Sequence, residues 1–211
     1  MGDAGAAGGE ANQAAAVTAG GAALADSDLA ELISTKIRDI ADYPQPGIVF
    51  KDITPLLADG SAFAAVVAAL AAGHGEGGEG GKGGRRKVSK VAGIEARGFI
   101  FAAPVALSLG AGFVPVRKQG KLPAATYTET YQLEYGTATI EVHTDAFEPG
   151  DRVLIVDDVL ATGGTAAATA RLVRRAGAEV AAITVLLELG FLHGRSRLSG
   201  LDVRSLYLSG G

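Results

Sequence analysis

A run of thirteen residues, VLIVDDVLATGGT at positions 153–165, constrains the fold of this chain more than any other segment. It begins with a short, continuous apolar stretch, which is typical of a strand covered on both faces in a parallel sheet. Two acids, Asp157 and Asp158, follow this stretch, and a turn of small residues then opens a helical pattern. In an open parallel sheet, ligands bind at the carboxyl ends of the strands. The run therefore predicts an α/β fold with a binding site beside the two acids.

The turn after the acids has the composition of a loop that binds a phosphate monoester. Backbone N–H groups at the start of a helix lie at the positive end of its dipole, and glycines let a ligand approach the backbone closely. No lysine follows the glycines, which separates this turn from the loops that bind nucleoside triphosphates. The turn consists of Ala161, Thr162, Gly163, Gly164 and Thr165.

Asp157 and Asp158 are adjacent, so on a strand their side chains point to opposite faces and at most one faces a given ligand atom. Carboxylates beside a phosphate loop are suitable acceptors for ribose hydroxyls. An ordinary tight turn and a charged strand end would each explain single residues without any function. The complete strand, turn and helix pattern instead favours a site for a sugar phosphate.

From position 88 onward, short apolar stretches alternate with helical patterns, which predicts crossover units and an open, mainly parallel sheet flanked by helices. Apolar and polar residues alternate over 138–143, and together with 127–135 this segment predicts a two-stranded excursion above the sheet. The expected strands of the sheet cover residues 88–94, 113–116, 152–156, 180–187 and 203–208, and the expected helices cover 99–109 and 164–176.

The N-terminal part of the chain predicts helices rather than strands. Asp28 and Glu31 have the spacing of a helix cap with its reciprocal acid, and apolar residues then recur at helical spacing, so a helix is expected over 28–41. Two prolines and a glycine predict a loop that continues to Pro55. A second helix is expected around residues 63–70.

Glycine is about twice as common as in an average chain, at 31 of 211 residues, which suggests that part of the chain is not folded. Fourteen of these glycines lie in residues 1–25 and 73–84. We therefore expect a disordered Ala/Gly-rich tail over 1–25, a flexible Gly-rich insertion over 73–87 and a single domain over 26–211.

Composition argues against several classes of protein. No apolar run approaches the roughly 18 to 20 residues that span a bilayer, and the N-terminus carries Asp3 and Glu10 rather than a basic start, so a cytoplasmic protein with no membrane partner is expected. Cysteine is absent and the three histidines are far apart, which argues against a zinc site. A net charge of −4 argues against a broad nucleic-acid surface.

The run at 153–165 and four further segments resemble the type I phosphoribosyltransferases, in particular their adenine-specific branch. The resemblance covers roughly residues 28–208. It implies the fold of that family, with a small N-terminal hood and a mobile two-stranded lid, and a reversible reaction in which adenine and phosphoribosyl diphosphate (PRPP) give AMP and pyrophosphate. The four segments are DYPQPGIVFKDITPLL (42–57), GIEARGFIFAAPVA (93–106), VRKQGKLPAATY (116–127) and YQLEYGTATIEVH (131–143).

The resemblance also implies the residues that bind PRPP and AMP. Arg97 would bind the pyrophosphate as a fixed cation and would act in catalysis, although without the resemblance a surface ion pair is the simpler interpretation. The family usually has a non-proline cis peptide here, which would be Glu95–Ala96. The cations that follow could equally form a solvated charge run. The implied residues are Arg97, Arg117, Lys118, Lys121, Tyr135, Asp157, Asp158 and the turn Ala161, Thr162, Gly163, Gly164 and Thr165.

For the purine, the resemblance implies that Phe50 stacks on adenine while backbone groups of Val49 and Lys51 contact its edge. A core strand is the alternative for this segment. Glu134, in the lid, would face the purine as the catalytic residue that handles a proton, and the alternative is an exposed acid of little consequence. A lid is required on chemical grounds, because water would capture an oxocarbenium-like state at the ribose carbon.

The implied cofactor is Mg²⁺, held by diphosphate oxygens, ribose hydroxyls and water, so no metal-ligating residues are expected. The implied assembly is a homodimer. Two alternatives remain open. One is a type I phosphoribosyltransferase for another base, such as xanthine or hypoxanthine. The other is a PRPP-sensing regulator that binds nucleic acid, for which the chain has neither a basic face nor an N-terminal DNA-binding helix pair.

Overall fold

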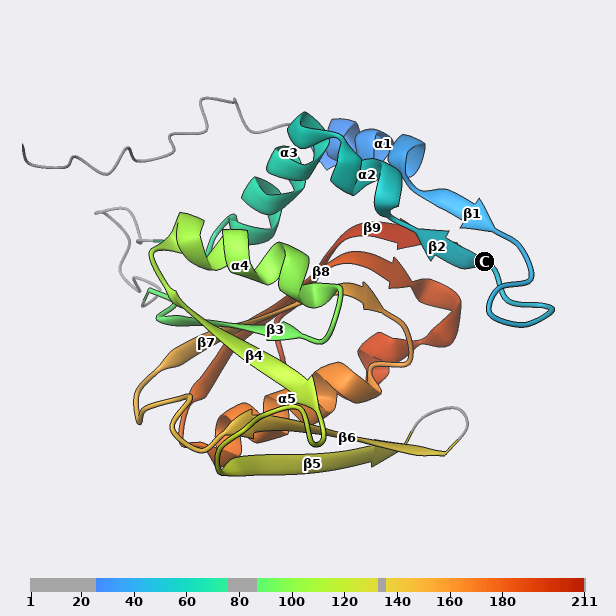
Figure 1. Cartoon of the computed structure of the whole chain (residues 1–211). Helices are drawn as coiled ribbons and strands as arrows, with labels where there is room; N and C mark the ends of the chain where they lie inside the picture. The colour runs from blue at the N-terminus through green and yellow to red at the C-terminus, as the bar shows by residue number, and fades with distance from the viewer. Residues whose placement is uncertain (1–25, 76–86, 133–135, 211) are drawn as a thin grey trace, which may run out of the picture.

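A seven-stranded sheet forms the centre of the protein, and Figure 1 shows it in a computed structural model that describes residues 26–75, 87–132 and 136–210. The strand order is β5-β6-β4-β3-β7-β8-β9, and β4, β3, β7, β8 and β9 are parallel. The expected open, mainly parallel α/β sheet is confirmed. The strands are β3 (Lys90–Ile94), β4 (Gly112–Lys118), β5 (Thr126–Gln132), β6 (Thr137–His143), β7 (Arg152–Leu160), β8 (Glu179–Leu189) and β9 (Val203–Ser209).

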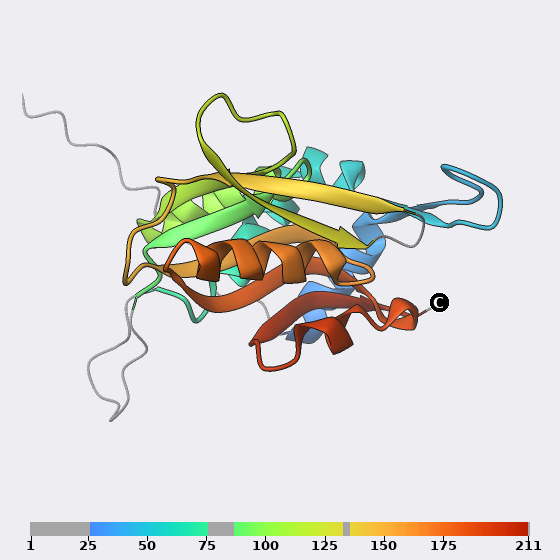
Figure 2. The same cartoon turned by 90° about the horizontal axis from the view of Figure 1, so that it is seen from below.

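Helices cover both faces of this sheet because its central strands are apolar on both sides. Leu154 and Val156 of β7 face one core cluster, together with α1 to α4, whereas Val153 and Ile155 face a second cluster with α5. All four side chains are fully buried. Among the described α-helices, only α5 lies on the side of the second cluster, as Figures 1 and 2 show. The helices are α1 (Asp26–Lys36), α2 (Thr54–Ala58), α3 (Gly60–Ala71), α4 (Gly98–Leu109) and α5 (Gly164–Arg175).

The expected helices α4 and α5 are confirmed, and their ends follow from glycines in the sequence. α4 ends at Gly110, whose φ of 59° lies in the left-handed region that glycine adopts without strain. α5 begins after Gly163, with φ of 77°, and no side chain caps its first turn. The backbone N–H groups at the start of α5 therefore remain directed at the sheet edge where β7 ends.

The expectation of one helix over 28–41 is wrong at both ends. α1 begins at Asp26 rather than after Asp28, and it stops at Lys36. Residues 38–40 form strand β1 (Arg38–Ile40), which pairs antiparallel with β2 (Phe50–Asp52) inside the expected loop. Cross-strand ion pairs explain the change, because Arg38 contacts Asp52 at 2.6 Å and Lys51 contacts Asp39 at 2.8 Å. This two-stranded sheet is the N-terminal hood.

The two-stranded excursion exists, but it is part of the main sheet rather than above it. β6 joins β4 through only two residue pairs, Arg117 with Glu141 and Lys118 with Ile140. β5 lies along α5, where Arg171 pairs with Glu129 and the Arg175 guanidinium covers the Tyr127 ring. The hairpin is therefore held mainly by α5.

Between β8 and β9 the chain forms two short 3₁₀ helices that the sequence did not predict, η1 (Gly190–Leu192) and η2 (Gly194–Leu198).

At the opposite side of the molecule, the N–H of Val88 donates to the carbonyl of His74 at 3.5 Å. The expected tail at 1–25 and residues 76–86 of the expected insertion lie outside the described residues. None of the described helices, of which the longest have 12 residues, has the length and apolar character needed to cross a membrane.

Candidate functional site

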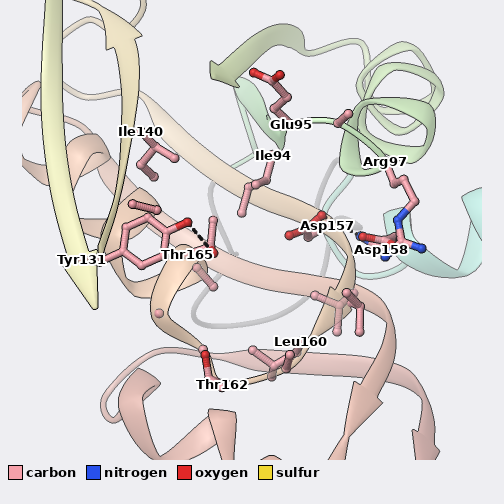
Figure 3. A pocket seen from close by; sticks show the side chains of 18 of the residues that line it. Ile94, Glu95, Arg97, Tyr131, Ile140, Asp157, Asp158, Leu160, Thr162 and Thr165 are labelled. Atoms are coloured by element: carbon pink, nitrogen blue, oxygen red, sulfur yellow. Dashed lines mark hydrogen bonds and ion pairs between the residues drawn. The ribbon is translucent and has the colours of Figure 1, made fainter. Parts of the chain in front are cut away.

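A pocket of about 530 Å³ lies at the carboxyl ends of the parallel strands, where the sequence placed it (Figure 3). Strand lengths create it, because β3 pairs with β7 only as far as Val156 whereas β8 pairs with β7 as far as Leu160. The last residues of β7 therefore face open space on the β3 side. The lining residues are Ile94 to Arg97, Lys118, Tyr131, Ala138, Ile140, Asp157 to Ala166, and Val185.

The two adjacent acids point in different directions, as strand geometry predicts. Asp158 is buried and forms an ion pair with Arg97, with 2.8 Å between Nε and Oδ2. Asp157 points away from Arg97 into the pocket, and its Oδ1 accepts the N–H of Asp158 at 2.9 Å (Figure 3).

Both acids have raised pKa values, so charge is incompletely compensated in this pocket. Burial is the main cause for Asp157, and the negative charge of Asp158 raises its pKa further. Burial also raises the pKa of Asp158, and the positive charge of Arg97 opposes that rise. A ligand that brings hydroxyl donors or a cation would therefore be stabilised here.

The small-residue loop lies against η2 so closely that Gly163 is needed for packing as well as for binding. A Cβ on Gly163 would overlap the carbonyl oxygen of Gly194, and a Cβ on Gly194 would overlap the carbonyl oxygen of Ala161. The Thr165 hydroxyl donates to the Tyr131 hydroxyl at 2.9 Å. All five predicted loop residues line the pocket.

Arg97 connects this pocket to the hood. Its guanidinium lies 5.0 Å from the centre of the Phe50 ring, which also contacts Tyr43 edge-on at 5.2 Å. Val49 is 51% exposed beside Phe50, and the Lys51 ammonium is paired with Asp39. The three residues predicted to contact the purine thus lie at the hood, on the far side of Arg97 from Asp158. They are not among the residues that line the pocket.

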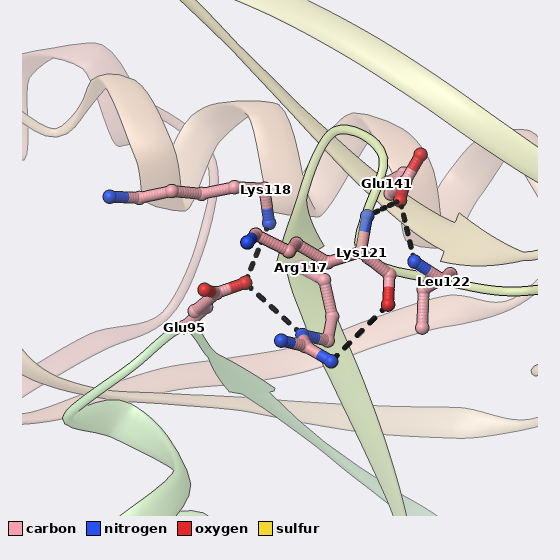
Figure 4. Close-up of polar contacts among 6 residues, drawn as sticks. All are labelled: Glu95, Arg117, Lys118, Lys121, Leu122 and Glu141. Atoms are coloured by element: carbon pink, nitrogen blue, oxygen red, sulfur yellow. Dashed lines mark hydrogen bonds and ion pairs between the residues drawn. The ribbon is translucent and has the colours of Figure 1, made fainter.

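Of the three predicted cations in the β4 turn, only Lys118 lines the pocket. The Arg117 guanidinium instead contacts Glu95 at 3.1 Å and donates to the Lys121 carbonyl at 3.3 Å (Figure 4). The buried Glu141 accepts the N–H groups of Lys121 and Leu122, each at 3.0 Å. Arg117 and the backbone of Lys121 therefore hold the turn together.

Glu95, at the pocket edge, is a compensated acid. Burial opposes its ionisation, but the Lys118 N–H and the Arg117 guanidinium outweigh burial and lower its pKa. The Glu95–Ala96 peptide is cis, as the resemblance implied.

The two lid residues, Glu134 and Tyr135, lie outside the described residues. Sequence reasoning missed Tyr131, Glu141 and Gly194. Tyr131 and Glu141 had a usable signal, the alternation of the hairpin, whereas nothing marks Gly194 as a neighbour of residues 161–163. Within the described part of the chain, no cluster of three or more metal-ligating side chains was found.

The family model of the phosphoribosyl transferase domain matches residues 56–204, more than half of the chain. This match, the sheet topology and the loop at 161–165 define the class as type I phosphoribosyltransferase.

Individual relatives narrow this class. The chain is 62% identical over 182 residues to the adenine phosphoribosyltransferase of Acidothermus cellulolyticus, covering 85% of this chain and 97% of that protein. It is similar to the solved adenine phosphoribosyltransferase of Rhodothermus marinus, with a TM-score of 0.78, 49% identity and coverage of 87% and 99%. The Saccharomyces cerevisiae enzyme, solved with adenine and an imino-altritol bisphosphate, matches with a TM-score of 0.74, 34% identity and coverage of 85% and 99%. The chain therefore belongs to the phosphoribosyltransferase family, within its adenine phosphoribosyltransferase group.

Proposed function

We propose that this protein transfers the 5-phosphoribosyl group of PRPP to adenine, giving AMP and pyrophosphate. One observation carries the proposal: a loop at the uncapped start of α5 and two undercompensated acids, Asp157 and Asp158, share one pocket. The N–H groups of the loop suit the 5-phosphate, and the acids suit ribose hydroxyls. The complex of the yeast relative with adenine supports the choice of base.

The remaining roles are those that the resemblance implies. Phe50 would stack on the adenine ring, with backbone groups of Val49 and Lys51 at the purine edge. Arg97, between Phe50 and Asp158, would contact the pyrophosphate as it leaves. Lys118 would add a second cation on that side.

In the transfer step, the bond between C1′ and the pyrophosphate oxygen breaks, the bond between C1′ and N9 of adenine forms, and N9 loses its proton. We assign the proton to Glu134, as the resemblance implies, with Tyr135 supporting the closed lid. Water must be excluded while C1′ is electron-poor, because hydrolysis would otherwise compete.

The pocket fits a hydrated magnesium ion that PRPP brings with it. Asp157 and Asp158 are hard oxygen donors whose pKa values are raised mainly by burial, and they would orient ribose hydroxyls and water around the ion. When bound, magnesium would supply positive charge to the leaving pyrophosphate.

The test is turnover with adenine, hypoxanthine, guanine and xanthine, each with PRPP and magnesium. We expect AMP formation from adenine alone. Turnover of an oxopurine without turnover of adenine would overturn the assignment in favour of a phosphoribosyltransferase for another base.

We also propose a homodimer, as the resemblance implies. Ile100 and Leu107, on the outer face of α4, are 40% and 82% exposed, which is unusual for large apolar residues so close together. Analytical ultracentrifugation should give twice the 21.2 kDa chain mass. A single species of chain mass at micromolar concentration would contradict the dimer.

A further inference from the structure

A cluster of three polar side chains lies behind the phosphate loop and outside the pocket. Glu188, near the end of β8, is buried with 7% of its surface exposed. The Arg195 guanidinium donates two hydrogen bonds to the Glu188 carboxylate, from Nε to Oε1 at 3.1 Å and from Nη2 to Oε2. Ser205 of β9 donates to the same carboxylate at 2.8 Å, and Arg195 Nη1 donates to the Val203 carbonyl at 2.6 Å. The cluster thus joins η2 to β8 and β9.

This cluster is connected to the phosphate loop at two points. Glu188 is the partner of Leu160 in the β7–β8 register, and Leu160 is the last residue before the loop begins at Ala161. Arg195 directly follows Gly194, whose backbone touches Ala161 and Gly163 so closely that neither glycine has room for a side chain. A displacement of η2 would therefore also displace the loop.

We propose that Glu188 and Arg195 are positioning residues that act on the phosphate loop. Their ion pair keeps Gly194 in contact with residues 161–163 and so maintains the loop in the conformation that binds the phosphate of PRPP. The inference rests on the proposed function. It assigns a task to a charge pair that lies outside the loop motif and is not among the residues that line the pocket.

The geometry supports a positioning role in addition to the contribution that the ion pair makes to stability. η2 also has an apolar anchor in Leu198, which is 2% exposed, so the ion pair is not the only contact that holds this segment on the second core. What the ion pair adds is the angle at which Gly194 meets the loop, since a bidentate guanidinium fixes orientation as well as distance. Misplacement of a binding group by about 1 Å is enough to cost up to a hundredfold in activity.

The chain offers a control on the same strand with the same chemistry, although the Glu179 side chain is 59% exposed and that of Glu188 is 9% exposed. Glu179, at the opposite end of β8, pairs with Arg152 of β7 at 3.5 Å, far from the pocket. Glu179→Gln and Glu188→Gln make the same chemical change, and each removes one carboxylate from an ion pair. Only Glu188→Gln is expected to affect the loop. Arg195→Lys is a second variant, which keeps the charge and loses the two-pronged geometry.

The experiment measures PRPP affinity by calorimetry in the presence of magnesium, with steady-state KM for each substrate and the thermal unfolding midpoint. Glu188→Gln should weaken PRPP binding by about tenfold and leave the KM for adenine within about twofold of the parent value. Arg195→Lys should fall between Glu188→Gln and the parent. Glu179→Gln should bind PRPP as the parent does.

PRPP binding equal to the parent in both Glu188→Gln and Arg195→Lys would overturn the inference while leaving the proposed function intact. An equal loss in the KM for adenine and in PRPP affinity would also overturn it, because that pattern indicates a general disturbance. A parent protein that does not bind PRPP would overturn the proposed function and this inference together.

Discussion

Two neighbouring strands carry carboxylates to the same edge of the sheet, and their surroundings differ in charge. Asp157 and Asp158, on β7, share a single cation, Arg97, and burial raises both pKa values. Glu188, on β8, has a guanidinium and a hydroxyl of its own, and Arg195 is the main cause of its lowered pKa. The acids that lack compensation lie in the pocket, and the compensated acid lies behind it.

This difference in charge compensation distinguishes acids that bind a ligand from acids that stabilise the fold. An acid whose pKa is raised by burial costs stability when ionised, and it is retained where a ligand provides the missing partner. An acid whose pKa is lowered by its neighbours stabilises the fold. Glu95, compensated by Arg117 and the Lys118 N–H, belongs to the second group although it borders the pocket.

The largest expected effect comes from removing the shared cation. Arg97→Ala would leave Asp158 buried with no partner and would also uncover the Phe50 ring. We expect kcat/KM for PRPP to fall by about a hundredfold or more, as for loss of a charged group that binds a leaving group. Steady-state kinetics at saturating adenine measure kcat/KM for PRPP. A decrease of less than about fivefold would contradict the proposed role of Arg97.

Asp157→Asn should separate affinity from stability. The amide removes a carboxylate that accepts from ribose, so PRPP affinity should fall by about tenfold. The same change removes like-charge repulsion with Asp158, so the unfolding midpoint at pH 7 should rise. Calorimetry and thermal unfolding test both signs. A lower midpoint with unchanged affinity would show that Asp157 is part of the scaffold.

The pH dependence of stability should have opposite signs for the two groups. Because the pKa of Glu188 is lowered, its contribution is present above its ordinary value of 4.5 and is lost as pH falls through the folded-state value. Because the pKa of Asp157 is raised, stability should increase as pH falls from neutrality through the folded-state value. Denaturant unfolding of the parent, Glu188→Gln and Asp157→Asn from pH 8 to well below pH 4.5 isolates each contribution. Curves of equal slope would contradict the comparison.

The smallest effect is expected at Glu141, where one carboxylate oxygen accepts two backbone N–H groups. A glutamine can accept the same two donors with its carbonyl oxygen, so Glu141→Gln should cost less than about 1 kcal/mol. Urea unfolding provides the value. A cost of several kcal/mol would mean that the charge, and not the acceptor geometry, holds the β4 turn.

The sequence was sufficient for the parallel sheet, α4, α5 and the phosphate loop, because these depend on local signals: continuous apolar strands and glycines at helix ends. It was insufficient for β1, because the apolar spacing of residues 37–40 also suits a helix. Residues 38–40 form a strand because they pair with β2; the partner of Arg38, for example, is Asp52, fourteen residues later.

The site was predicted in part for the same reason. Asp157, Asp158 and the loop are contiguous, so their proximity follows from one segment. Arg117 contacts Glu95 rather than the pocket because of how β4 lies relative to the end of β3. Gly194 lies against the loop because of the path that the chain takes after β8. Neither arrangement has a local signal.

The contact between His74 and Val88 has a practical consequence. Their backbones meet at 3.5 Å, so the described segments that end at residue 75 and begin at residue 87 come together at one point, ahead of the amino end of β3 and across the sheet from the pocket. A reporter domain whose own termini are close together could be grafted between these two residues without separating α3 from β3. We therefore expect the domain to accept an insertion at this point with the geometry of the pocket unchanged.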